Sequence, residues 1–315
     1  MDRVMMMATI KQERKKINKL IKRDNRNNQT IDRFYQQALS IIGNHLHEFY
    51  NEYADENGLT LNQVSQNVNS WDIQEFYQAI NEMLADVSPD DKLSQRLQAI
   101  YAQASISRRD MLGALIGAGM SIATARSESF AVNELKQQYI DGYEDFSPRK
   151  LATVPAKVAK QTEYSQRVWV HGDVMTTRMK ETLNKGLSRG MGQADINKMT
   201  RSIPQSGDRI DGNLATPMNQ MLSRIHTLTI DEGANNSNKG KSKAYEEQNV
   251  KYVMWLTQED DHVCDICEPL DRQIFPYGEA PIPIADTHPR CRCQLVACDE
   301  NGILLKGQTD EVLQD

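Results

Sequence analysis

The chain has 315 residues, of which 39% are hydrophobic, 25% charged and only 6% aromatic. This length allows two modest domains or one helical body with a small appendage. The polar, aromatic-poor composition favours long amphipathic helices over a sheet-rich enzyme with a large aromatic core. The net charge of -6 excludes a general nucleic-acid coat, because neutralising phosphates requires a basic excess. Any contact with DNA must therefore be local.

No segment is expected to cross a membrane. The longest apolar stretch, residues 111–123 (MLGALIGAGMSIA), is too short to span a bilayer and is rich in glycine. The first residues place three consecutive methionines before a run of charges and lack an extended apolar core, so they do not resemble a secretory signal. We expect a protein that is made and used in a cytoplasm.

The N-terminal half is predicted to be a series of helices. Residues 9–26 form a basic opening with too few apolar residues for a wide face, which indicates a solvated helix or, alternatively, a contact with phosphates or an acidic partner. Residues 31–53 carry apolar side chains at three- and four-residue steps, which predicts an amphipathic helix. His45 and His47 lie on it and are expected at its surface or core edge. The remaining helices of this half are expected over residues 70–84, 90–101 and around 111–123.

Beyond a boundary at Phe146-Ser147-Pro148, the spacing predicts a helix over residues 169–187 and a short one at 193–199. Residues 201–219, rich in Pro, Gly, Ser and Asn, are expected to form an exposed loop. After a helix over residues 221–232, the polar stretch 232–250 is expected to be a flexible connection that proteases cut first.

All five cysteines lie in the last sixth of the chain, which indicates a chemical role rather than packing alone. The pattern is Cys264-x-x-Cys267, then a segment with glycine and prolines, then His288-Pro289-Arg290-Cys291-Arg292-Cys293. A C-x-x-C turn and a second knuckle can supply four ligands to one structural zinc ion. For the second pair we favour His288 with Cys293 and keep Cys291 as the substitute.

Other interpretations of this cluster stay open. A four-cysteine site is physically sensible, because Cys291 and Cys293 face the same side of an extended chain. Disulfides or reduced thiols are also compatible with the spacing. A catalytic zinc or a Cys291 nucleophile assisted by His288 is disfavoured, since the site has a full ligand set and no separate general base. Cys298 is expected to be a free or packed thiol and His262 a solvated neighbour.

These motifs together resemble the phage head morphogenesis family named for the F protein of phage Mu. The resemblance covers roughly residues 160–296 and is carried by several short sequences. They are Arg167-Val168-Trp169, residues 186–196 (GLSRGMGQADI), Trp255-Leu256-Thr257, residues 261–267 (DHVCDIC), Leu270-Asp271 and residues 288–293 (HPRCRC). The chain departs from the family pattern at His226-Thr227-Leu228, where an Arg-Thr-Glu run is common, and at Arg272, where glycine is common after Leu-Asp.

The resemblance implies a minor head protein without enzymatic activity, located in the virion head and, during assembly, in the host cytoplasm. Its implied partners are the portal protein and other head or scaffolding proteins. Phage DNA is a further expected partner through two local basic sites, the opening segment and the pair Arg290 and Arg292. The alternative is a nucleic-acid- or nucleotide-modifying enzyme, a toxin-like effector using the Cys/His site, although no phosphate-binding glycine loop or paired carboxylates are visible.

The predicted fold is mainly α: an elongated helical N-terminal body followed by a small α+β metal-binding C-terminal module. We expect four parts in linear order, a helical body over 1–147, a helical segment and flexible connection over 148–250, a Cys/His module over 251–300 and an acidic tail over 301–315. The module's strands are expected near residues 252–256 and 273–275.

Overall fold

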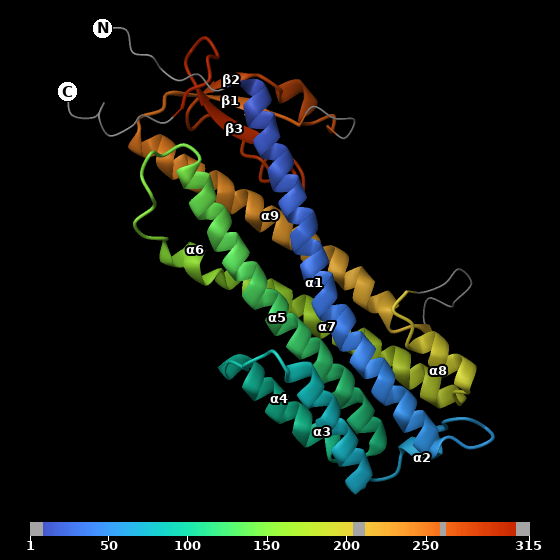
Figure 1. Ribbon diagram of the computed structural model, residues 1–315. Helices are drawn as coiled ribbons and strands as arrows, with labels where there is room; N and C mark the ends of the chain where they lie inside the picture. Colours follow the sequence, from blue (N-terminus) through green and yellow to red (C-terminus); the bar gives the residue numbers. More distant parts are fainter. Residues whose placement is uncertain (1–8, 204–211, 259–262, 307–315) are drawn as a thin grey trace. The chain divides into compact units, whose positions relative to one another are not determined.

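The computed structural model describes residues 9–203, 212–258 and 263–306 (Figure 1). This part of the chain is mainly helical and carries one small antiparallel sheet, which confirms the predicted fold class. No helix among the described residues is long and apolar enough to cross a membrane.

Long helices alternate with short ones along the chain. In order they are α1 (Ile10–Tyr53), α2 (Leu61–Val64), α3 (Ser70–Leu84), α4 (Asp91–Ala104), α5 (Arg108–Glu144), α6 (Ala156–Lys160), α7 (Thr162–Arg189), α8 (Gln193–Met199) and α9 (Ala215–Glu247). The sheet follows, with strands β1 (Tyr252–Leu256), β2 (Ile274–Pro276) and β3 (Gln294–Cys298), and the short 3-10 helix η2 (Glu268–Leu270) lies between β1 and β2.

The chain folds into two compact units, each built from segments that are distant in sequence. Unit 1 comprises residues 1–28, 131–164 and 226–315, and unit 2 comprises residues 29–130 and 165–225. These units cut across the linear parts expected from the sequence, because α1, α5 and α9 each contribute residues to both.

Unit 2 is a helical assembly with one large apolar core. The predicted amphipathic face of residues 31–53 is buried there, including Ile31, Ile42 and Phe49. Helix α5 is apolar all round over residues 111–123, and its small residues permit close contacts. A Cβ on Gly119, for example, would lie 2.8 Å from Ile42 Cδ1.

Unit 1 is organised around the sheet, whose strand order is β2-β1-β3. Central strand β1 has the bounds predicted from the sequence, and both its neighbours pair with it in antiparallel register. Because successive side chains alternate between faces, Met254 and Leu256 pack against Ile17 of α1, while Val253 packs with Tyr245 of α9. Burial on both faces explains why β1 is a continuous apolar run. The third strand, β3, is not apparent in the sequence pattern.

The basic opening does not form a fully solvated helix. It is the first part of α1, which runs unbroken from Ile10 through the predicted amphipathic helix to Tyr53. Its few apolar residues are enough to cover one face of the sheet, since Ile10, Ile17 and Ile21 all join that cluster.

The prediction of a flexible connection over residues 232–250 is wrong, because α9 continues to Glu247. The small residues of this stretch permit close packing of α9 on α5: a Cβ on Gly240 would lie 2.1 Å from Tyr139 O, and one on Gly142 would lie 2.2 Å from Ser237 O. Ser237 and Lys241 are buried, and Lys241 pairs with Asp145. The composition of this stretch is typical of a linker, but in the structure its small side chains allow two helices to pack closely.

The expected loop over residues 201–219 is shorter in the structure, since α9 begins at Ala215. Asn213 organises this start: its side chain donates to the carbonyls of Lys198 and Arg201 and accepts from the Ala215 amide. Residues 204–211, part of the same expectation, lie outside the described residues.

Candidate metal centre

The first ligand pair lies on a tight turn after β1. The backbone amide of Cys267 donates to the Cys264 carbonyl at 3.0 Å and contacts the Cys264 Sγ at 3.3 Å. Helix η2 begins at the next residue and fixes the end of this turn. Both sulfurs are thereby presented on the same side of the loop, as a C-x-x-C knuckle requires.

The second pair lies on a similar turn before β3. The amide of Cys291 donates to the carbonyl of His288 at 3.3 Å, the same three-residue closure as in the first knuckle. Arg290 takes a left-handed backbone conformation, φ 64°, and its amide donates to Asp231 of α9 at 2.6 Å. The sequence H-x-x-C thus folds as the counterpart of C-x-x-C.

The distances between donor atoms fit a tetrahedral ion. Cys267 Sγ lies 3.5 Å from His288 Nε2 and 3.7 Å from Cys291 Sγ. Zn–S bonds of about 2.3 Å place tetrahedral sulfurs about 3.8 Å apart. The structure brings all five predicted site residues together in two overlapping groups, Cys264, Cys267 and His288, and Cys267, Cys291 and Cys293, with donor atoms within 4.8 Å of one another in each.

The histidine tautomer also suits a metal ligand. His288 Nδ1 lies 2.8 Å from the Pro289 carbonyl oxygen, which can only accept a hydrogen bond. In the neutral imidazole the proton therefore resides on Nδ1, which leaves the lone pair of Nε2 for a metal ion. A backbone carbonyl on the second ring nitrogen is the usual outer-shell partner of a ligating histidine.

The pKa values of the cluster cysteines indicate whether a cation would suit this site. A hydrogen bond from Cys293 lowers the pKa of Cys291 to about 5, while the reciprocal interaction raises the pKa of Cys293. Burial, together with the neighbouring Cys291, raises the pKa of Cys267 to about 12. Burial opposes ionisation of Cys264, but hydrogen bonds from Cys267 and the Ile266 amide lower its pKa overall. The protein alone thus favours thiolates at Cys264 and Cys291 and opposes them at Cys267 and Cys293. A divalent cation would remove that opposition, because it stabilises coordinated thiolates.

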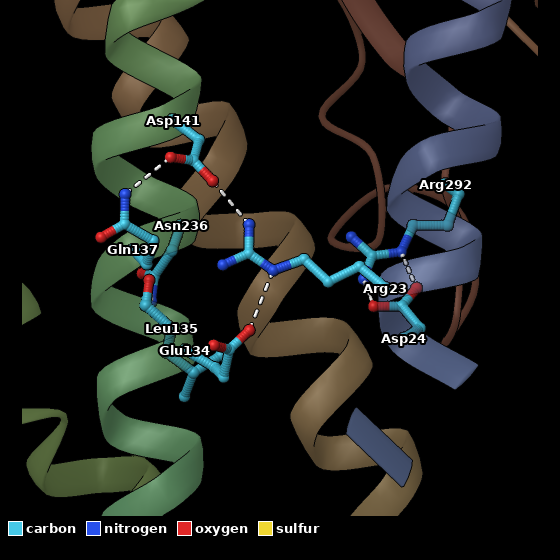
Figure 2. Close-up of polar contacts among 8 residues, drawn as sticks. All are labelled: Arg23, Asp24, Glu134, Leu135, Gln137, Asp141, Asn236 and Arg292. Carbon is cyan, nitrogen blue, oxygen red and sulfur yellow. Dashed lines mark hydrogen bonds and ion pairs between the residues drawn. The ribbon is translucent and has the colours of Figure 1, made fainter. Parts of the chain in front are cut away.

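A buried ion pair fixes the loop between the last two cluster cysteines. Arg292 donates through Nε and Nη2 to both carboxylate oxygens of Asp24 on α1, and each of these side chains is 7% exposed (Figure 2). The expectation that Arg292 offers a surface positive site is therefore wrong. Its alternation with Cys291 and Cys293 directs it away from the sulfurs and toward α1.

A second anchor joins α1 to the turn before β2. Asp271 Oδ1 accepts from the amide and hydroxyl of Thr257, at 2.8 and 2.7 Å, and its Oδ2 accepts from Arg14 at 2.8 Å. Arg272 at this turn has φ 63°, the left-handed conformation that favours glycine, the residue common at this position in the family. The Asp271 carboxylate thus connects the end of the W-x-T motif, the Leu-Asp turn and α1, which explains both motifs.

Two other titratable residues singled out in the sequence lie away from the cluster. Cys298 is buried on the α1 face of the sheet and is a packed thiol, as predicted. His45, expected at the surface or core edge, is buried in unit 2 between Glu75 and Glu82. His262 lies outside the described residues. Sequence reasoning missed Asp24, because an aspartate in a basic helix gives no signal of a partner far along the chain.

Residues 177–296 match the family model described as phage Mu protein F like protein, and this match ends just after the second knuckle. Over this region the chain is similar to that family of phage head morphogenesis proteins, which confirms the resemblance found in the sequence. The match includes every predicted metal ligand and the C-terminal part of α7, together with α8 and α9. Neither the curated proteins nor the solved structures gave a match to the chain.

Proposed function

We propose that this protein is a minor head protein of a tailed phage that enters the procapsid by docking to the portal or to neighbouring head proteins. The observation that carries the proposal is the family match over residues 177–296, which includes the Cys/His knuckles. Its role is assembly of the head or delivery of the genome, and it acts through surfaces rather than through a catalytic cleft.

The proposed resident ion is one structural zinc, held by Cys264, Cys267, His288 and Cys291. Two similar knuckles, the donor distances and the histidine tautomer support this set. It replaces the earlier preference for Cys293 in the fourth position. When bound, the ion adds binding free energy to folding. The residues themselves close both knuckles, orient the imidazole and exclude water from two of the four ligands, Cys267 and Cys291.

A closed ligand set favours a structural role over a catalytic one, since a catalytic zinc needs an open coordination position. Three acidic residues near the cluster already have structural partners: Asp24 pairs with Arg292, Asp231 accepts from Arg290, and Asp271 holds Thr257 and Arg14. They are therefore poor candidates for a general base. The function that we propose is accordingly not an enzymatic one.

The decisive experiment compares particles made with and without this protein. Portal protein is purified from infected cells and tested for co-purification of the full chain, and the composition of procapsids and mature particles is then measured. We expect the protein in procapsids and a loss of infectious particles in its absence, with other head proteins still expressed.

Two results would overturn this proposal. One is absence of the protein from particles at every stage. The other is hydrolysis of a nucleotide or nucleic acid by the pure protein, abolished by a Cys264→Ser substitution, which would support the toxin-like alternative. Particles that retain DNA but fail to infect would place the action at genome delivery rather than at assembly.

A further inference from the structure

The two sides of the first part of α1 differ sharply in charge. Its inner side packs within unit 1, where Arg14 pairs with Asp271. Asp24 pairs with Arg292, and Arg23 pairs with Glu134 and Asp141 of α5 (Figure 2). Both acids of the segment, Glu13 and Asp24, are on this buried side. Its exposed side therefore carries no negative charge of its own.

Four lysines define the exposed side, and we call Lys11, Lys15, Lys19 and Lys22 the lysine stripe. Their spacing of four, four and three residues places them within an arc of about 80° over a length of about 17 Å. Within the described part of the chain, none of the four side chains forms an ion pair or hydrogen bond. A protein with net charge -6 thus presents a local row of unpaired positive charge.

We propose that the lysine stripe binds the phosphate backbone of duplex DNA without sequence preference. This rests in part on the proposed function, which places the protein beside packaged DNA. Lysines are point charges suited to phosphates, whereas protein interfaces are depleted in lysine and enriched in aromatic residues and arginine. The other exposed residues of the segment are Gln12, Asn18, Asn25 and Arg26, so it offers neither a hydrophobic anchor nor an aromatic platform for unstacked bases.

Docking on the sheet gives the stripe its orientation. Ile17 of α1 is buried against the sheet. The ion pairs of Arg14 and Asp24 prevent rotation of this part of α1 about its axis. The backbone that carries the lysine stripe is therefore already ordered before DNA binds. A preoriented row loses less conformational entropy on binding than a flexible basic arm would.

The test measures binding of the full-length, metal-loaded protein to a random-sequence duplex of about 30 base pairs by fluorescence anisotropy over a range of salt concentrations. The stripe variant carries Lys11→Gln, Lys15→Gln, Lys19→Gln and Lys22→Gln. The matched control carries Lys136→Gln, Lys160→Gln, Lys185→Gln and Lys198→Gln, four exposed helical lysines with the same change in net charge.

We expect the stripe variant to bind at least tenfold more weakly at about 0.1 M salt, with the slope of log K against log salt reduced by about 3 to 4. The control should bind like the unaltered protein, and both variants should keep their zinc content and thermal unfolding. The proposal is overturned if the unaltered protein does not bind the duplex, or if the two variants lose affinity equally. Loss of procapsid entry in the stripe variant without loss of DNA binding would instead assign the lysines to a protein partner. Because the assay uses pure protein, its failure is separate from failure of the proposed assembly role.

Discussion

At the scale of single residues, the choice between Cys291 and Cys293 decides the ligand set. We expect Cys291→Ser to abolish stoichiometric zinc binding, because it removes the fourth ligand from the two-knuckle site. Cys293→Ser should retain about one zinc per chain, and Cys298→Ser serves as a matched control in the same strand region. Elemental analysis with thiol titration measures each variant. Retention of zinc by Cys291→Ser together with its loss in Cys293→Ser would restore the original preference for Cys293.

The buried pair of Asp24 and Arg292 makes a second residue-level prediction. Asp24→Asn leaves the guanidinium buried without its counter-charge, and removal of one partner from such a pair costs about 3 to 5 kcal/mol. The double substitution Asp24→Leu with Arg292→Met should recover most of this free energy, since apolar replacements of buried pairs are often neutral. Denaturant unfolding measures both. Equal destabilisation by the single and double variants would show that the unpaired guanidinium is not the cause of the loss, and would contradict this prediction.

At the scale of elements, the contact between α5 and α9 depends on glycine. A Cβ added at Gly240 would lie 2.1 Å from the backbone oxygen of Tyr139, and no side-chain rotation can relieve that overlap. Gly240→Ala should therefore destabilise unit 1 by about 1 to 3 kcal/mol or more.

The control for this prediction is Gly113→Ala, a helical glycine in unit 2 whose added Cβ would meet nothing nearer than 3.9 Å. That change should stabilise the protein by up to about 1 kcal/mol through helix propensity. Thermal unfolding compares the two, with limited proteolysis of residues 232–247 as a second readout. Early cleavage within α9 in the unaltered protein would contradict the close packing described here.

These elements also show what sequence patterns could predict. The apolar periodicity of residues 31–53 and the apolar run of β1 report burial directly, so their structures were predictable. The knuckles were predictable because ligand spacing is local. The helix over residues 232–247 was not, since small polar residues are shared by linkers and by close helix contacts. Nor was the Arg292–Asp24 pair, whose partners are 268 residues apart.

At the scale of the whole molecule, the two units should respond differently to metal removal. Unit 2 has its own large apolar core, whereas the core clusters of unit 1 are small and one of them consists largely of cysteines around Trp255. Chelation should therefore abolish hydrogen-exchange protection in β1, β3 and residues 10–28 while protection in α3 and α4 persists. Readdition of zinc should restore it. Unchanged protection throughout would show that the ion is dispensable for the fold.

The discontinuity of unit 1 also has a consequence for folding during synthesis on the ribosome. Its first segment ends at residue 28, yet the sheet that this segment covers begins at Tyr252, and the arginine that meets Asp24 follows it by 268 residues. At ribosomal rates of about 5 to 20 residues per second, the opening of α1 waits on the order of ten to fifty seconds for its partners. Until then its isoleucines have no sheet to cover. A chain terminated before β1 could complete unit 2 but not unit 1, so any binding surface that requires unit 1 would be offered only by chains that extend through β3.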